Sequence, residues 1–379
     1  MSATPVLPGR AGILSDRLLV QTAADDAHDL ALLADRPGSG LVLTGTNALR
    51  VARLLRRAHP RLPILTDRRR YAGRRRVTGV TGVAGFDRAW IETQRELRVA
   101  SVLTDSGYIG RADVRALRAV LGQAGRAGPD VTAVLPLHAD WLHHDLEQLC
   151  RLVADHGVPV ALVLDRPSDP LGEIKTVYGL TALLGLPVPV ALLGGDLSAL
   201  GALAFGAAWA AFGVRSRPRH LHPVRDGAGR WGGANGSANG SANRAANRAA
   251  NESTNGPAGG RPVGRVSALV DPALALVDVE RIAAAWAATQ DDPDWVCDCT
   301  VCAGRTMDWM LIAGPLEANT HTVQRLLERR DRLASLPPGS LRRQSWRAQC
   351  ASAEFQCRAM ALAGVSWQVP RYLRHWQRI

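Results

Sequence analysis

The segment Cys297-Asp298-Cys299-Thr300-Val301-Cys302, followed by His321, is the stretch from which the fold of this chain is best worked out. Three thiolates and one imidazole form a complete tetrahedral ligand set for Zn²⁺. The alternative is three buried cysteines and a surface histidine, but three of the chain's six cysteines fall within six residues. We therefore predict a structural Zn²⁺ site that folds a subdomain and has no open position for catalysis, with four ligands: Cys297, Cys299, Cys302 and His321.

Length and charge limit the function classes. The chain has 379 residues, of which 46% are apolar, enough for one large barrel-type domain with an appendage or for two domains. Its net charge is +12, and the positive charge is almost all arginine, since Lys175 is the only lysine. Such a charge favours a polyanionic partner such as nucleic acid. A genome-wide preference for Arg and Ala would produce the same bias, so the charge alone is weak support.

Two features bear on localisation. Residues 1–11 lack the apolar core of a cleavable signal, and the cysteine usage fits a reducing compartment, so we expect a cytoplasmic protein. Between Thr176 and Val214 the only charge is Asp196, and Leu197–Val214 is long enough for a membrane span. Glycines and prolines break this run into short pieces, and strands buried on both faces give the same pattern. We favour buried strands and expect no membrane partner.

Short apolar runs alternate with helical segments along the chain, which predicts a parallel α/β fold. The predicted strands are Leu41–Thr44, Pro63–Thr66, Val102–Thr104, Val131–Leu135, Val158–Leu164 and Val188–Leu193, with Ala208–Val214 and Val266–Val270 as less certain members. The predicted helices are Asn47–Ala58, Ala112–Ala124, Leu142–Asp155 and Ile174–Leu184. Eight such strands would close into a (β/α)8 TIM-type barrel, and an open doubly wound sheet is the main alternative.

The chain divides by composition into three predicted parts. Residues 1–290 form the barrel, interrupted by a low-complexity insertion at 225–265 whose Gly-Ser-Ala-Asn and Asn-Arg-Ala-Ala repeats cannot bury a core. Residues 291–335 form the zinc-binding subdomain. Residues 336–379, which contain three tryptophans and several arginines, form a C-terminal helical extension packed on the barrel.

Polar residues recur just after the predicted strands. They are Asp67, Asp105, His138 with Asp140, Asp165 and Asp196. The carboxyl ends of the strands are where a barrel of this type places its active site. The segment Val102–Tyr108 is a strand followed by a tight turn, in which Gly107 lets backbone N–H groups approach a ligand and Tyr108 offers a stacking face.

These motifs resemble those of the tRNA-guanine transglycosylases, which combine a (β/α)8 barrel, a (Ser/Thr)-Asp-Ser-Gly motif after a strand and a C-x-C-x2-C…His zinc subdomain. Thr104-Asp105-Ser106-Gly107 and the Cys3His set match in order, and Gly194-Gly195 is a looser match to a base-contacting Gly-Gly. The resemblance implies exchange of a guanine in nucleic acid for a free 7-deazaguanine. It also implies a covalent glycosyl-aspartate, with Asp105 in base recognition and proton transfer and Tyr108 stacking on the purine.

The chain departs from this family at the nucleophile. The segment that should carry the nucleophilic Asp, Gly206–Ala211, contains no acid. We expect Asp196 to replace it, with Asp165 in reserve, since an unpaired carboxylate in an apolar run is costly unless it is used. The structural alternatives are an N-cap role for Asp196 and an ion pair of Asp165 with Arg166. The expected substrate-binding residues are Ser106, Gly107, Tyr108, Asp140, Asp165, Gly194 and Gly195.

The nucleic acid itself is also an expectation. Arg215, Arg217, Arg219 and His220 form a basic cluster suited to a phosphate backbone or simply to solvent. The displaced nucleophile resembles the DNA-modifying branch of the family, so we favour DNA over tRNA. The alternatives are a queuine- or archaeosine-type tRNA enzyme, a non-catalytic nucleic-acid-binding relative, and a barrel enzyme acting on a small molecule. By analogy with the family, a homodimer is expected through the metal-bound appendage.

Overall fold

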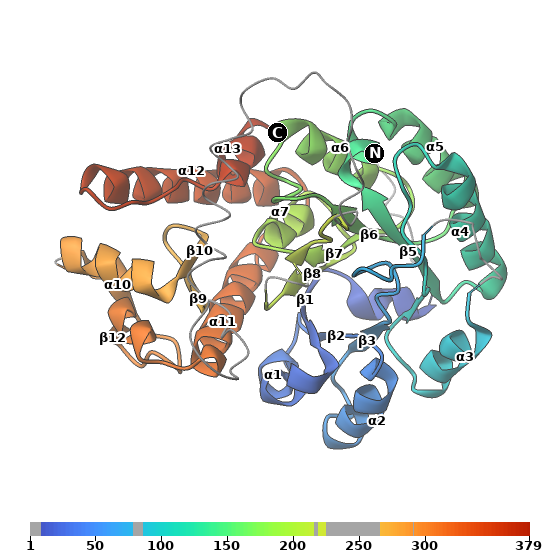
Figure 1. The fold of residues 1–379 in the computed structure, drawn as a ribbon, viewed down its shortest axis with the longest axis horizontal. Helices are drawn as coiled ribbons and strands as arrows, with labels where there is room; N and C mark the ends of the chain where they lie inside the picture. The colour runs from blue at the N-terminus through green and yellow to red at the C-terminus, as the bar shows by residue number, and fades with distance from the viewer. Residues whose placement is uncertain (1–8, 79–85, 216–218, 225–265, 291) are drawn as a thin grey trace, which may run out of the picture.

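The computed structural model describes residues 9–78, 86–215, 219–224, 266–290 and 292–379. The insertion at 225–265 and Arg217 therefore lie outside the described residues. Within these ranges, an eight-stranded, all-parallel sheet curves into a nearly closed barrel with strand order β3-β2-β1-β8-β7-β6-β5-β4 (Figure 1). Its strands are β1 (Arg17–Ala23), β2 (Leu41–Thr44), β3 (Ile64–Asp67), β4 (Val102–Leu103), β5 (Val131–His138), β6 (Val160–Asp165), β7 (Val190–Gly195) and β8 (Trp209–Gly213).

Helices surround the strands on the outside of the barrel (Figure 1). They are α1 (Ala27–Ala34), α2 (Ala48–Ala58), α3 (Arg88–Glu96), α4 (Val114–Ala127), α5 (Leu146–His156), α6 (Ile174–Leu184) and α7 (Ser198–Ala204). Side chains alternate along each strand, so Leu19 and Leu65 fill the barrel interior while Leu18 and Ile64 pack under the helices. The prediction of an α/β TIM-type fold is confirmed at this level.

The predicted strand set was wrong in one member. Val266–Val270 is not a barrel strand, because β9 (Ser267–Val270) pairs antiparallel with β10 (Ala275–Asp278) in a separate hairpin. The missing barrel strand is β1, which pairs in parallel with both β2 and β8. The long apolar run from Thr176 to Val214 corresponds to α6, β7, α7 and β8. Among the described residues, no helix is both long and apolar enough to cross a membrane.

The junction between β3 and β4, here called the seam, is closed mainly by side chains. The two strands are the ends of the sheet order, and a backbone bond from Ala100 N to Ile64 O at 3.1 Å links them just before β4. Gln94 of α3 takes the place of a paired strand at Leu103. Its Nε2 donates to Leu103 O at 2.9 Å, and its Oε1 accepts from Leu103 N at 3.0 Å. The buried edge of β4 is thereby satisfied.

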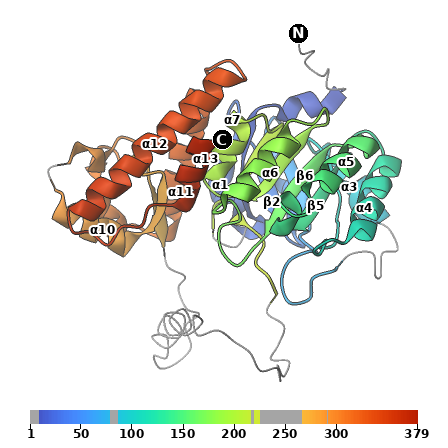
Figure 2. The ribbon, with the colours of Figure 1, turned by 90° about the horizontal axis from the view of Figure 1, so that it is seen from above.

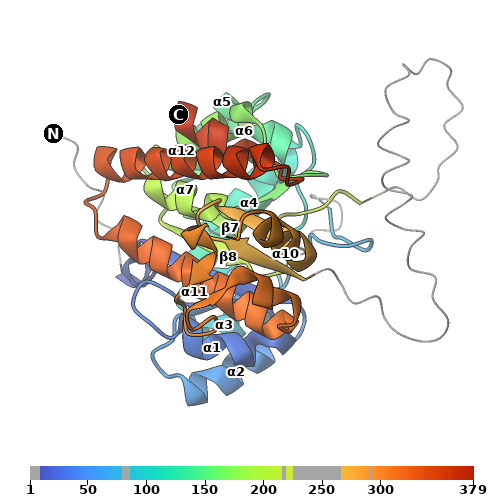
Figure 3. The same cartoon turned by 90° about the vertical axis from the view of Figure 1, so that its left-hand side faces the viewer.

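An appendage, residues 266–379, lies against one side of the barrel (Figures 1 and 2). It contains the β9–β10 hairpin, α10 (Val279–Ala288), the two-residue strands β11 (Val296–Cys297) and β12 (Arg305–Thr306), α11 (Pro315–Ala334), α12 (Ser340–Leu362) and α13 (Arg371–Arg378). Figure 3 shows α11 and α12 running across the face that the appendage presents. The predicted domain limits at residues 290 and 335 stay predictions, although β9 packs on α11 rather than in the ring of strands.

Close packing fixes the C-terminal helices to the barrel. Gly201 of α7 lies beneath two tryptophans, and a Cβ at this position would be 2.6 Å from Trp376 and 2.7 Å from Trp346. One turn earlier in α12, the Arg342 guanidinium forms an ion pair with Asp16 at 2.7 Å, just before β1. The appendage is therefore held to the barrel by a buried contact and by charge.

Candidate functional site

Carboxylates gather at the carboxyl ends of the barrel strands, here called the barrel mouth. Asp67 ends β3, Asp105 follows β4 and Asp165 ends β6, and all three are buried. Asp67 Oδ2 accepts a 2.6 Å hydrogen bond from the Tyr71 hydroxyl, and burial raises the pKa of this carboxyl. Buried carboxylates are costly unless charges or hydrogen bonds compensate them, so their partners matter.

Those partners come from an arginine-rich loop after β3. Arg70 Nη1 lies 2.8 Å and Arg68 Nη1 3.3 Å from Asp105 Oδ2, and the backbone N–H of Asp87 donates to Asp105 Oδ1 at 3.2 Å. Sequence reasoning missed this loop. The signal was present in Arg68-Arg69-Arg70 and Arg74-Arg75-Arg76, six arginines in nine residues directly after a strand.

The turn after β4 has the tight geometry expected of it. The Thr104 and Ser106 hydroxyls lie 2.8 Å apart, and Thr104 Oγ1 accepts from Val134 N of β5 at 2.8 Å. Tyr108 N donates to Val77 O at 2.7 Å, and a Cβ at Gly107 would meet that same carbonyl at 3.0 Å. The backbone of the arginine-rich loop therefore packs against Gly107, where a larger residue would push it away.

Asp165 and Tyr108 meet at the barrel mouth through Arg76. The Arg76 guanidinium lies 3.8 Å from the Tyr108 ring centroid, and its Nη1 is 3.3 Å from Asp165 Oδ2. Burial and the neighbouring Asp165 carboxylate raise the pKa of the Tyr108 hydroxyl. Asp165 Oδ1 is buried without a hydrogen-bond partner. Arg166, the expected partner of Asp165, pairs with Glu173 instead.

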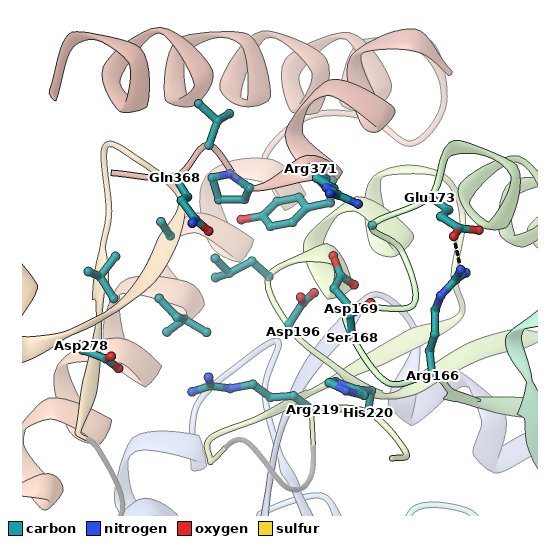
Figure 4. Close-up of a pocket in the computed structure, with 18 of the residues that line it drawn as sticks. Arg166, Ser168, Asp169, Glu173, Asp196, Arg219, His220, Asp278, Gln368 and Arg371 are labelled. Carbon is teal, nitrogen blue, oxygen red and sulfur yellow. Dashed lines mark hydrogen bonds and ion pairs between the residues drawn. The ribbon is translucent and has the colours of Figure 1, made fainter. Parts of the chain in front are cut away.

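Asp196 directly follows β7, at another part of the barrel mouth. It lines a cavity of about 750 Å³ between the barrel and the appendage, with Asp169, Arg219 and Tyr372 among the other lining residues (Figure 4). Neither Asp105 nor Tyr108 is among the described residues that line this cavity. Burial, and then the proximity of Asp196, raise the pKa of Asp169 to about 8, and burial also raises the pKa of Asp196.

The structural alternative for Asp196 is present in the fold. Its Oδ1 accepts a 2.8 Å hydrogen bond from Ser198 N at the start of α7, as a helix-capping carboxylate does. Gly194 adopts φ of +71°, a conformation that favours glycine, and Gly195 packs against Ala211 O. Asp196 as the nucleophile stays a prediction, and the geometry groups it with Asp169 rather than with Asp105.

The predicted phosphate-binding cluster is divided by the fold. Arg215 is exposed and pairs with Asp26 at 3.2 Å. Arg219 instead donates to Gly213 O at 3.1 Å and to Val214 O at 2.9 Å, and burial lowers its pKa to about 10. His220 lines the cavity beside Arg219, and burial lowers its pKa to about 4 (Figure 4). A role in backbone binding stays a prediction for these residues and for Arg217.

Asp140 occupies a polar turn after β5. Its Oδ2 lies 3.1 Å from Arg111 Nε and its Oδ1 3.2 Å from His143 Nε2. Burial lowers the pKa of both His138 and His143, which favours neutral imidazoles at pH 7. Sequence reasoning placed Asp140 among the substrate-binding residues and left His143 out, although the sequence His-x-Asp-x-x-His-His that contains both was visible.

The predicted metal ligands converge. Cys297, Cys299, Cys302 and His321 are all buried, and their ligand atoms lie within 4.8 Å of one another. His321 Nδ1 is 3.6, 3.4 and 3.3 Å from the sulfurs of Cys297, Cys299 and Cys302. Tetrahedral Zn²⁺ with ordinary Zn–S and Zn–N bonds would set these edges at about 3.6 Å. His321 Nε2 lies 2.8 Å from Leu269 O, the kind of outer contact that orients a metal-binding imidazole.

The fold and this cluster define the chain as a TIM-type α/β barrel protein with an appended Cys3His group able to hold a metal ion. No protein-family profile matches the chain, and a search of curated proteins finds no match.

Proposed function

We propose that the chain exchanges guanine for a 7-deazaguanine base in nucleic acid, with DNA favoured over tRNA, as the resemblance to the tRNA-guanine transglycosylases implies. One observation carries the proposal. Asp105 and Asp165 are both buried at the barrel mouth, and one arginine-rich loop contacts both of them through Arg70 and Arg76. Two carboxylates at one site are what a retaining base exchange requires.

The roles follow from the surroundings of each carboxylate. Asp165 is buried at the barrel mouth beside Arg76 and Tyr108, so we assign it as the nucleophile, and Asp196 becomes the second candidate. Asp105 enters the reaction as the protonated acid. An Asp165 oxygen forms a bond to C1′ as the C1′–N9 bond breaks, and the departing guanine accepts the Asp105 proton. The incoming base then gives its N9 proton to Asp105 and attacks C1′, which releases the Asp165 carboxylate.

Other side chains at the barrel mouth would bind rather than react. The base leaves its helical stack at a cost of a few kcal/mol, and Tyr108 would stack on the purine if Arg76 moves off the ring that it covers. Arg68, Arg70 and Arg76 would hold the phosphates beside the flipped nucleotide. A Zn²⁺ ion bound by the Cys3His set would stabilise the appendage, since four protein ligands leave it no open position.

Labelled guanine incorporation into duplex DNA and into tRNA tests the proposal. Wild type should incorporate label faster into DNA, and both Asp105→Ala and Asp165→Asn should lose at least about 10³-fold in rate. If Asp196→Asn is inactive while Asp165→Asn is active, the nucleophile is Asp196. Incorporation into tRNA alone would reassign the substrate, and absence of exchange on either substrate would overturn the proposal.

A non-catalytic nucleic-acid-binding relative is the second candidate. It is favoured by the lack of a carboxylate in Gly206–Ala211, the segment leading into β8 where the family resemblance places the nucleophile. Binding without exchange, with an affinity that falls steeply as salt rises, would support this candidate. Salt-insensitive or absent binding would instead favour a small-molecule substrate.

A further inference from the structure

A second set of metal-ligating side chains lies on the turn after β5. Asp140 belongs to a short 3-10 turn, Ala139–Leu142, and His143 and His144 follow it directly. Ligand atoms of these three residues lie within 4.8 Å of one another. The two imidazole rings are 4.1 Å apart between centroids and tilted by 60°. None of the three contributes to the Cys3His set.

His143 lacks the partners that a buried imidazole needs. Both of its ring nitrogens are buried and neither makes a hydrogen bond, although Nε2 lies 3.2 Å from Asp140 Oδ1. Buried polar atoms without partners are rare in folded proteins and each calls for a physical reason. A cation held between His143 Nε2 and the Asp140 carboxylate would supply the missing partner of Nε2.

Arg111 and His138 hold Asp140 from the other side. Arg111 Nε lies 3.1 Å from Asp140 Oδ2 and donates to His138 Nε2 at 3.2 Å, while Asp140 N donates to His138 Nδ1 at 3.1 Å. Arg111 therefore contacts Oδ2 of Asp140, and Oδ1 of Asp140 faces His143. Ligating carboxylates are commonly oriented by outer partners of this kind.

The turn that carries these residues is tightly packed. Trp141 is buried, and its Nε1 donates to Gly110 O at 2.7 Å. The next carbonyl, Leu142 O, packs so closely on α6 that a Cβ at Gly179 would lie 1.8 Å from it. Metal sites need ligands that their surroundings hold in place, and this turn provides such support.

We propose that Asp140, His143 and His144 bind a divalent first-row transition metal ion. Two imidazoles and one carboxylate suit Zn²⁺, Fe²⁺, Co²⁺ or Ni²⁺, and three protein ligands leave coordination positions open, unlike the closed Cys3His set. An open position takes water or an anionic oxygen from a substrate. This site goes beyond base exchange and does not depend on it.

Co²⁺ is the probe, because its absorption distinguishes the two sites. The full chain is first loaded with one equivalent of Zn²⁺, which the Cys3His set takes, and then titrated with Co²⁺, and metal content per chain is measured after gel filtration. We expect one Zn²⁺ and one Co²⁺ per chain, with the Co²⁺ lacking thiolate charge-transfer absorption. Asp140→Asn and His144→Ala should lose the second ion or bind it at least about 10-fold more weakly. His144 is exposed, so its replacement leaves the packing of the turn intact.

His59→Ala is the matched control, because His59 also pairs with an aspartate, Asp35, at 3.0 Å but belongs to no cluster of three potential metal ligands in the described part of the chain. This variant should bind two ions as wild type does. Cys302→Ser should lose the thiolate-ligated metal and keep the Co²⁺ ion at the turn. One ion per wild-type chain at saturating Co²⁺, or wild-type affinity in folded His144→Ala, would overturn the proposal.

Discussion

Arg76 and Asp165 form an ion pair at the barrel mouth, with Arg76 Nη1 3.3 Å from Asp165 Oδ2. The arginine comes from the loop after β3 and the aspartate ends β6, so the pair connects distant parts of the ring of strands. The same guanidinium covers the Tyr108 ring at 3.8 Å. One cation therefore compensates a buried carboxylate and holds the turn that contains Asp105.

Replacement of Arg76 by alanine should destabilise the fold by about 1–3 kcal/mol, because Asp165 would be left buried without its charged partner. Urea unfolding monitored by circular dichroism measures the change. Arg75→Ala is the matched control, since Arg75 is exposed in the same loop, and it should stay within about 0.5 kcal/mol of wild type. Equal stability of the two variants would show that Asp165 does not need this cation.

Loss of a sulfur ligand should remove a metal ion and loosen the appendage. Cys302→Ser should contain one fewer bound metal ion per chain than wild type, with a loss of several kcal/mol in stability, because metal binding contributes to folding free energy. Metal analysis by mass spectrometry and thermal unfolding measure both effects. Cys150→Ser, which removes a half-buried thiol outside the cluster, should keep the wild-type metal content. An unchanged metal content in Cys302→Ser would contradict the assignment.

Asp169 should make stability fall as pH rises. Its pKa is raised to about 8 in the folded chain and is near 4 when unfolded, so the folded state holds the extra proton between these values. Below about pH 4 the carboxyl is protonated in both states, so it adds no pH dependence to stability. Between about pH 4 and pH 8 the free energy of unfolding falls as pH rises. Asp169→Asn should remove this dependence and raise the free energy of unfolding by on the order of 1 kcal/mol at pH 8. The gain stays this small because solvent in the cavity screens the carboxyl pair.

Urea unfolding between pH 5 and pH 8.5 measures this effect of Asp169→Asn. Asp155→Asn, which changes an exposed carboxylate on α5, serves as the control and should keep the wild-type pH dependence. A wild-type stability that rises over this range, with Asp169→Asn following it, would show that Asp169 is ionised in the folded chain.

Two glycine replacements should act in opposite directions. Gly201→Ala should destabilise by about 1–3 kcal/mol, because its Cβ would lie 2.6 Å from Trp376 and overpack the contact with the C-terminal helices. Gly122→Ala, also in a helix, places its Cβ no nearer than 3.5 Å to Arg126 and should stabilise by about 0.5–1 kcal/mol. Thermal unfolding and near-UV circular dichroism report both. A stabilising Gly201→Ala would mean that α12 and α13 do not pack as described.

The predicted fold class came from alternating apolar runs, and these located seven of the eight barrel strands. The first strand was missed because Gln21 and Thr22 interrupt its short apolar run, yet both are buried in the structure. Val266–Val270 was wrongly assigned to the barrel because its composition alone was considered. It has the composition of a buried strand, and only tertiary contacts show that β10 is its partner.

The candidate site was predictable where ligands are close in sequence or where chemistry restricts them to few residue types. The Cys3His set met both conditions. The arginines that contact Asp105 and Asp165 did not, because an arginine run usually signals a solvated loop. The separation of Asp196 from Asp105 also could not be predicted, since strand order and the position of the appendage decide which carboxylates share a cavity.

The seam has a consequence for how this barrel can change over evolutionary time. Gln94 satisfies both backbone groups of Leu103, so this edge of β4 needs no further strand there. Substitutions among the arginines of the loop after β3 would alter how many guanidinium groups reach Asp105 and Asp165 while every paired strand keeps its neighbour. Sequence drift in this loop would thus retune which anionic ligand the protein accepts, at a folding cost set by the Arg76–Asp165 ion pair.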